Sequence, residues 1–232
     1  MTVLETIEEY ISYINSSSQK RTEEVYCISL LYDYCKYKEA QLEIEELDES
    51  FFDKFFLYWL PIRNKMLSGD RLYYLFPSIK KYYKYLRNNY KIKELNLSKS
   101  LDKFIEEFIR IINLSKAFSR FLGNPVISVD PLIVDLRCYK ESKLKKSIKE
   151  RNGVFEQGYF EVIDISPDCS ITIKKKPKGR YAKILLDDDL VLHLKKGDIL
   201  QLKITRRLFF TYWEIEEIKS CYLKEATKYL LG

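Results

Sequence analysis

The stretch FIEEFIRIINLSKAFSRFLGNPVISV (104–129) contains the point at which the pattern of the chain changes. Up to Phe121, apolar residues recur at steps of three and four, which is the spacing of an amphipathic helix. Gly123, Asn124 and Pro125 are helix stop signals, and beyond them apolar and polar residues alternate in short runs typical of strands. The sequence therefore predicts an α+β fold class, in which an N-terminal helical bundle is followed by a small antiparallel β-barrel.

This change of pattern divides the chain into three parts. We expect a helical domain over residues 1–96, a connecting helix over 97–124 and a β-rich, barrel-like domain over 125–232. A chain of 232 residues is long enough for two small domains. The composition is 46% hydrophobic and 32% charged with only 7 glycines and 6 prolines, which favours packed domains over disorder.

Before residue 125 the helical spacing occurs in separate stretches, at about 3–14, 20–39, 49–60, 70–87 and 101–121. The stretch 49–60 is rich in phenylalanine and holds Trp59, and aromatic residues at this spacing usually form core. Pro61 should end this helix, because proline has no N–H and restricts the residue before it. Pro77 should kink or split the helix in which it lies.

Beyond residue 125 we expect short elements. Residues 126–139 should be extended, 140–150 should be a short basic helix or linker, and 151–158 should be a turn. Strands should follow at 159–166, 169–176, 181–187, 190–194, 198–207 and 209–220, before a short final helix. Strands at such regular spacing, separated by turn residues, indicate a barrel or a strongly curved sheet.

The composition also argues against several kinds of chemistry. His193 is the only histidine and the five cysteines include no C-x-x-C pair, so neither a metal site nor a cofactor is expected. We interpret the adjacent Asp187, Asp188 and Asp189 as a turn, since neighbouring strand side chains point in opposite directions and would not share a cation. No apolar run could cross a bilayer and the N-terminal residues are acidic, so we expect a cytoplasmic protein with no membrane partner.

The formal net charge of +6 is compatible with a nucleic-acid partner without requiring one. Basic residues gather at the start of the second expected helix and along the fourth: Lys20, Arg21, Lys80, Lys81, Lys84 and Arg87. Lys80, Lys84 and Arg87 lie at steps of four and three, so they share one helical face. Contact with a phosphate backbone and a solvated helix face both fit this pattern.

A second basic group lies between two expected strands. Residues 174–180 are KKKPKGR, whose basic members are Lys174, Lys175, Lys176, Lys178 and Arg180. A basic hairpin beside a small barrel can contact a phosphate backbone. Lysines also keep exposed sheet edges from aggregating, so a solvated loop is the alternative interpretation.

The order of elements over residues 1–95 resembles the N-terminal, SAM-like core-binding domain of phage integrases and other tyrosine recombinases. The resemblance is carried by LETIEEYISYI, by Thr22-x-x-x-Tyr26-x-x-x-Leu30, by LDESFFDKFFLYWL and by IKKYYKYLRNNY. In that family the domain is one half of a clamp around duplex DNA, with its second and fourth helices facing the grooves. The resemblance implies double-stranded DNA as partner, and it nominates as contacts Lys20, Arg21, Thr22, Lys80, Lys81, Lys84 and Arg87.

The catalytic part of that family has no counterpart here. Its chemistry needs a tyrosine nucleophile, arginines on the scissile phosphate and an H-x-x-R motif, whereas His193 is followed by Leu194, Lys195 and Lys196. The strand-rich second half also differs from the mainly helical catalytic domain of that family. We therefore expect a non-enzymatic DNA-binding protein. The alternative is a protein–protein interaction module, such as an inactive relative that pairs with a recombinase.

Overall fold

The computed structural model describes residues 1–16, 21–63, 69–90, 92, 95, 97–123, 153–207 and 209–231 of the 232-residue chain. The chain forms two compact units, Met1–Ile109 and Arg110–Gly232, and the change from one to the other falls within α6 (Leu97–Phe121). The expected domain boundary at residue 125 and the expected elements at 126–139 and 140–150 lie outside the described residues. Helices and an antiparallel sheet are both present, so the predicted α+β class is confirmed.

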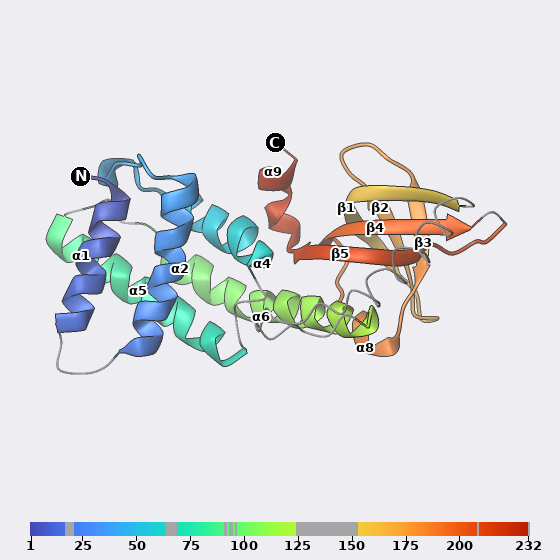
Figure 1. Ribbon diagram of the computed structural model, residues 1–232, viewed down its shortest axis with the longest axis horizontal. Helices are drawn as coiled ribbons and strands as arrows, with labels where there is room; N and C mark the ends of the chain where they lie inside the picture. The colour runs from blue at the N-terminus through green and yellow to red at the C-terminus, as the bar shows by residue number, and fades with distance from the viewer. Residues whose placement is uncertain are drawn as a thin grey trace, which may run out of the picture. The chain divides into compact units, whose positions relative to one another are not determined.

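The first unit is built around three helices, α1 (Val3–Ser16), α2 (Thr22–Lys38) and α5 (Gly69–Tyr90). Figure 1 shows α1 and α2 side by side, with α5 running across both. The apolar residues at helical spacing are buried, among them Ile7, Ile28 and Leu75, none of which has accessible surface. Pro77 lies inside α5 without splitting it, so of the two predicted outcomes, a kink or a split, the split does not occur.

An aromatic helical segment follows the short 3-10 helix η1 (Ile44–Glu46). It consists of α3 (Glu49–Asp53), the π-helical segment η2 (Lys54–Trp59) and α4 (Leu60–Ile62). The prediction that Pro61 ends this helix is wrong, because Ile62 is still helical. In the π-helical segment the Leu60 N–H donates to the carbonyl of Phe55, five residues back. This wider turn relieves the clash that a proline ring makes with the preceding turn of an α-helix.

The aromatic side chains of this segment form the core of the first unit, as the sequence predicts. Phe56 is 3% exposed, and its ring stacks on Phe76 with 4.9 Å between the ring centroids. Phe108 lies edge-on to both rings, at 6.3 Å from Phe56 and 6.0 Å from Phe76. Because Phe108 belongs to α6, that helix contributes to this core.

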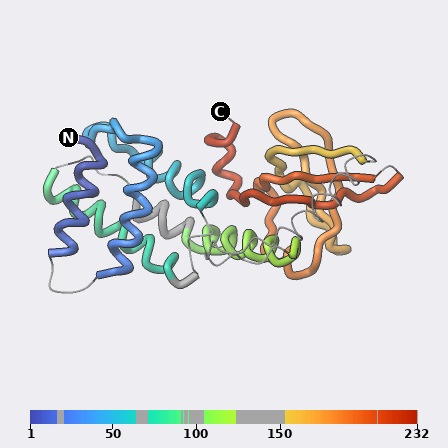
Figure 2. The backbone as a smooth tube through the Cα atoms, in the orientation of Figure 1, coloured from blue at the N-terminus to red at the C-terminus, as the bar shows by residue number. Residues whose placement is uncertain are grey.

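The second unit contains a five-stranded antiparallel sheet in the order β3-β2-β1-β4-β5. The strands are β1 (Gly153–Ile165), β2 (Ser170–Lys175), β3 (Tyr181–Leu185), β4 (Ile199–Arg207) and β5 (Glu214–Tyr222). The long β1 pairs with both β2 and β4, and a shift of register between Val162 and Asp164 marks a bulge that bends it. The tube in Figure 2 follows β4 through its loop into β5.

The sheet is not closed into the predicted barrel. Its edges are β3 and β5, and no ladder between these two strands is found among the described residues. One isolated bridge connects Ile184 of β3 with Trp213, the residue before β5. At this bridge the Trp213 N–H donates to the Lys183 carbonyl at 2.8 Å. A closed barrel would need a continuous hydrogen-bonded ladder around the sheet, so the outcome is a curved, open sheet.

Three stretches of the second unit fold differently from the prediction. Of the strand expected at 209–220, only the part from Glu214 on is strand, in β5, and residues 209–213 form the loop that leads into it. Residues 151–158, expected as a turn, include the start of β1, which pairs with β4 from Gly153 on. Residues 190–194, expected as a strand, begin within the short helix α8 (Asp188–Val191). Leu190 and Leu194 are buried whereas Leu192 is 79% exposed. A strand would place all three side chains on one face, while a helical turn places Leu192 on the other side.

An ion pair attaches the last part of α6 to the sheet within the second unit. The Arg110 guanidinium donates to both carboxylate oxygens of Asp198, at 2.6 and 2.8 Å, and to the carbonyl of His193 at 2.7 Å. Asp198 is 3% exposed and also accepts the N–H of Lys195 at 2.8 Å. A buried pair of this geometry fixes α6 against the turn that leads into β4.

The chain ends in a 3-10 turn, η4 (Lys224–Ala226), and the short helix α9 (Thr227–Leu230), which agrees with the predicted final helix. In the part of the chain that the structure describes, no helix combines the length and the apolar character needed to cross a membrane.

Candidate nucleic-acid interface

A groove lies between α1, the start of α2 and the second half of α5. Its volume is about 490 Å³, and it is lined by Tyr10, Tyr13, Arg21, Lys81, Lys84, Tyr85, Asn88 and Asn89. The lining combines three cations, three phenols and two side-chain amides, and it includes no acidic residue from the described part of the chain. Cations and amides of this kind bind phosphate oxygens, and aromatic rings stack on bases or sugars.

Lys81 is held in the groove by a buried carboxylate. Its Nζ donates to Glu24 Oε2 at 2.6 Å, and the Tyr10 hydroxyl donates to the other carboxylate oxygen at 2.8 Å. The Glu24 side chain is 6% exposed whereas that of Lys81 is 56% exposed. Burial is the main cause that raises the pKa of Tyr10, and the hydrogen bond to Glu24 raises it further. The Tyr10 hydroxyl therefore keeps its proton. The network fixes the position of Lys81 and offsets part of its charge.

The groove brings together three of the residues nominated from the sequence: Arg21, Lys81 and Lys84. Thr22, Lys80 and Arg87 are not part of its lining, although all three belong to α2 or α5. Lys20 lies outside the described residues.

The lining follows a stripe of α5 made of Lys81, Lys84, Tyr85 and Asn88, at steps of three and four residues. The sequence predicted the neighbouring stripe that begins at Lys80. Helical spacing groups the residues of α5 into stripes. Which stripe lines the groove depends on which side of α5 faces α1.

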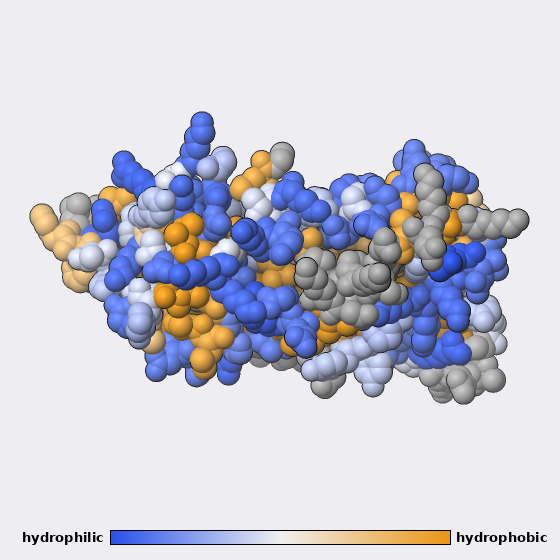
Figure 3. Space-filling view, turned by 180° about the vertical axis from the view of Figure 1, so that it is seen from behind, coloured by the Kyte–Doolittle hydropathy of each residue, from blue (hydrophilic) through white to orange (hydrophobic). Residues whose placement is uncertain are grey.

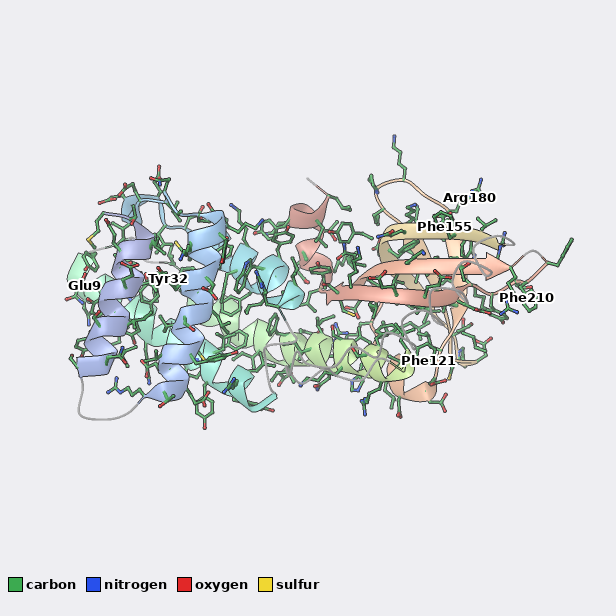
Figure 4. All side chains as sticks on the ribbon, viewed as in Figure 1. Glu9, Tyr32, Phe121, Phe155, Arg180 and Phe210 are labelled. Atoms are coloured by element: carbon green, nitrogen blue, oxygen red, sulfur yellow. The ribbon has the colours of Figure 1, made fainter. Side chains whose placement is uncertain are left out.

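Tyrosine rings make up one wall of the groove and give it a defined shape. Tyr85 packs against Tyr10 with 4.9 Å between ring centroids and against Tyr13 with 5.7 Å. The fully buried Tyr82 lies 5.4 Å from Tyr10, which supports that ring from the core side. Glu9, labelled in Figure 4, is on the same helix as Tyr10 and accepts a hydrogen bond from Tyr90.

The tyrosines and asparagines of the groove are not among the contacts nominated from the sequence. Tyr85 and Asn88 follow Lys81 by four and seven residues, so helical spacing was an available signal for them. Tyr10 and Tyr13 come from α1, and no pattern in the sequence connects them to α5.

The basic hairpin between β2 and β3 contains residues that pair with the sheet and residues that face outward. Lys175 and Lys176 are part-buried and form ion pairs with Glu156 and Glu161 of β1, at 3.4 and 2.5 Å, so they mainly attach the hairpin to the sheet. Lys178 and Arg180, the latter labelled in Figure 4, are exposed at the turn. Lys174 points to the outer face, where its Nζ lies 5.2 Å from the centroid of the Tyr181 ring.

No cluster of three or more histidine, cysteine, aspartate or glutamate side chains that could hold a metal ion is found among the described residues. Asp187 is the N-cap of α8, and Asp188 and Asp189 lie in its first turn. Burial raises the pKa of the Cys35 and Cys221 thiols to about 12, so neither is a reactive thiolate near neutral pH.

Comparison of the chain with protein-family models, with curated proteins and with solved structures finds no match.

Proposed function

We propose that this protein binds double-stranded DNA without cleaving it, and that the groove between α1, α2 and α5 contacts the DNA backbone. The observation that carries the proposal is the lining of that groove. Arg21, the N-cap residue of α2, converges there with Lys81 and Lys84 of α5, in a lining with no acidic residue from the described part of the chain. Converging cations are the usual means by which proteins bind phosphate groups.

The charge balance of the groove favours an anionic ligand. Like charges that converge repel one another, and Glu24 offsets part of this repulsion through its ion pair with Lys81. Phosphate oxygens would offset it for Arg21 and Lys84. The side-chain amide of Asn88 adds a donor of the kind that positions a protein along a DNA backbone, whereas Asn89 Nδ2 donates to the Tyr85 carbonyl at 2.9 Å.

The resemblance to core-binding domains of tyrosine recombinases points in the same direction. In those domains the second and fourth helices face duplex DNA, and here the groove lies on α2 and on α5, the helix that resembles the fourth one. We propose on this ground that the helical unit is a DNA-contacting module of that kind, and that Lys178 and Arg180 of the second unit add backbone contacts.

The proposal is tested with a fluorescently labelled duplex of about 20 base pairs and the full chain, by fluorescence anisotropy at about 0.1 M salt. Lys84→Glu should weaken binding at least about tenfold, since each phosphate contact contributes roughly that factor at this salt concentration. Lys38→Glu is the matched control, because Lys38 is an exposed residue in the last turn of α2, outside the groove. It changes the net charge equally and should weaken binding much less.

Two results would contradict the proposal. Equal losses in Lys84→Glu and Lys38→Glu would mean that net charge, and not the groove, attracts the DNA. Absence of duplex binding even at about 50 mM salt would favour the alternative of a protein–protein interaction module, whose partner binding should depend little on salt.

A further inference from the structure

Exposed aromatic side chains gather in one region of the second unit, on β3 and on the loop between β4 and β5. Tyr181 and Phe210 are each 59% exposed, Tyr212 is 38% exposed and Phe209 is fully exposed. Figure 3 shows the hydrophobic end of this loop at the left edge of the view, and Figure 4 labels Phe210 in it. Isolated exposed aromatic residues are ordinary, but a group of them marks a contact surface.

The strand register places two of these residues beside lysines on the outer face of the sheet. Lys174 of β2 lies opposite Tyr181 of β3, and Lys183 follows on the same face of β3. The alternate residues Ala182 and Ile184 are 5% and 1% exposed, so they face the core. Tyr181 and Lys183 are therefore not required for packing of the inner face.

The β4–β5 loop adds a second ring to this face. The Trp213 N–H donates to the Lys183 carbonyl at 2.8 Å, which brings the end of the loop against β3. As a result the Lys183 Nζ lies 5.4 Å from the centroid of the Tyr212 ring. We call Lys174, Tyr181, Lys183 and Tyr212 the β3 platform: two exposed rings, each with an ammonium group close to it.

The charge of Lys183 remains accessible to a ligand. The Lys183 Nζ also lies 3.7 Å from Asp168 Oδ2, but the two side chains are 39% and 55% exposed. In such an exposed ion pair another anion can readily replace the carboxylate. Beyond the platform, the Arg207 Cζ lies 5.9 Å from the centroid of the Phe210 ring. A cation beside an aromatic ring therefore also occurs in this loop.

We propose that the β3 platform binds single-stranded nucleic acid, with bases stacked on Tyr181 and Tyr212 and phosphates paired with Lys174 and Lys183. Exposed rings beside cations are the combination that single-stranded nucleic acids bind. A duplex does not suit this surface, because its bases are already paired and stacked and cannot cover the rings. This site is separate from the helical groove, and the inference does not depend on duplex binding there.

The test uses the full chain and labelled single strands of about 12 nucleotides, one of deoxythymidine and one of uridine, in anisotropy titrations. Tyr181→Ala and Tyr212→Ala should each weaken single-strand binding about tenfold, which is the loss of one stacked base. Tyr181→Phe keeps the ring and should bind almost as tightly as the wild type. Tyr37→Ala is the control, because Tyr37 is 66% exposed but lies on α2 in the helical unit.

The outcomes separate this site from the groove. The inference holds if the two alanine variants lose single-strand affinity, keep the wild-type melting temperature and keep their affinity for duplex. It is overturned if neither strand binds, if Tyr181→Ala and Tyr212→Ala bind as the wild type does, or if Tyr37→Ala loses as much. Binding of both strands indicates that the platform does not read the 2′-hydroxyl, and binding of one alone identifies the ligand as DNA or RNA.

Discussion

Replacing Arg110 with methionine should strongly destabilise the second unit, because it leaves the carboxylate of Asp198 buried without its partner. Asp198 is 3% exposed and Arg110 is 13% exposed, so water screens neither group well. Removing one member of such a buried pair costs about 3–5 kcal/mol. At about 4 °C for each kcal/mol in a unit of this size, the melting temperature should fall by about 12–20 °C.

Tryptophan fluorescence can follow this unit alone. Trp213 is buried beside β3 in the second unit, so a Trp59→Phe background removes the signal of the first unit. Arg120→Met is the matched control, because Arg120 is an exposed residue near the end of the same helix, and its melting temperature should change by less than about 2 °C.

A double variant separates the buried charge from lost packing. Asp198→Asn in the Arg110→Met background removes the uncompensated charge but keeps an oxygen for the Lys195 N–H. It should be more stable than Arg110→Met alone. A melting temperature for Arg110→Met within about 2 °C of that for Arg120→Met would refute the reasoning.

Three further changes test individual contacts. Asp48→Ala removes the cap of α3 and should cost about 1 kcal/mol in urea unfolding at neutral pH. Partial burial raises the pKa of Asp48, but the hydrogen bonds that its carboxylate accepts outweigh this effect, so the pKa is lowered. The stability that the cap contributes should therefore be fully present above about pH 4 and be lost as the pH falls through the lowered pKa. Phe108→Ala should cost about 3–5 kcal/mol, since its ring fills the aromatic core; a cost below about 1 kcal/mol would contradict that packing. Asp188→Asn should speed alkylation of Cys169 at about pH 8, because the Cys169 thiol donates to the Asp188 carboxylate and this contact raises the pKa of the thiol. Asp189→Asn is the control and should leave the alkylation rate unchanged.

The helical core could be predicted from the sequence because its signals are local. Apolar residues at steps of three and four identified the faces of α1 and α2, and the phenylalanines before Pro61 are core as expected. The effect of Pro61 itself could not be predicted. Proline ends an α-helix by a steric clash, and the π-helical turn that relieves this clash leaves no mark in the local pattern.

In the second unit the sequence pattern was ambiguous where elements are short. The apolar run at 190–194 fits a strand, and only the exposure of Leu192 between two buried leucines reveals a helical turn. Closure of the sheet is likewise not a local property, since it depends on the pairing of β3 with β5, two strands far apart in the sequence.

The candidate groove was predictable only in part, for a similar reason. The charges on α5 can be read from the sequence, and so can their helical spacing. Which stripe of α5 meets Tyr10 and Tyr13 depends on how α1 packs against it, and packing between distant helices is a tertiary property.

The most direct test of the central claim is the salt dependence of duplex affinity in the wild type and in an Arg21→Gln/Lys84→Gln variant. Each phosphate neutralised by the protein contributes about 0.9 to the slope of log affinity against log salt concentration. If the groove contacts the DNA backbone through Arg21 and Lys84, the variant should bind more weakly at about 0.1 M salt, and its slope should be shallower by about 1.8. An unchanged slope in the variant would show that duplex DNA does not occupy the groove.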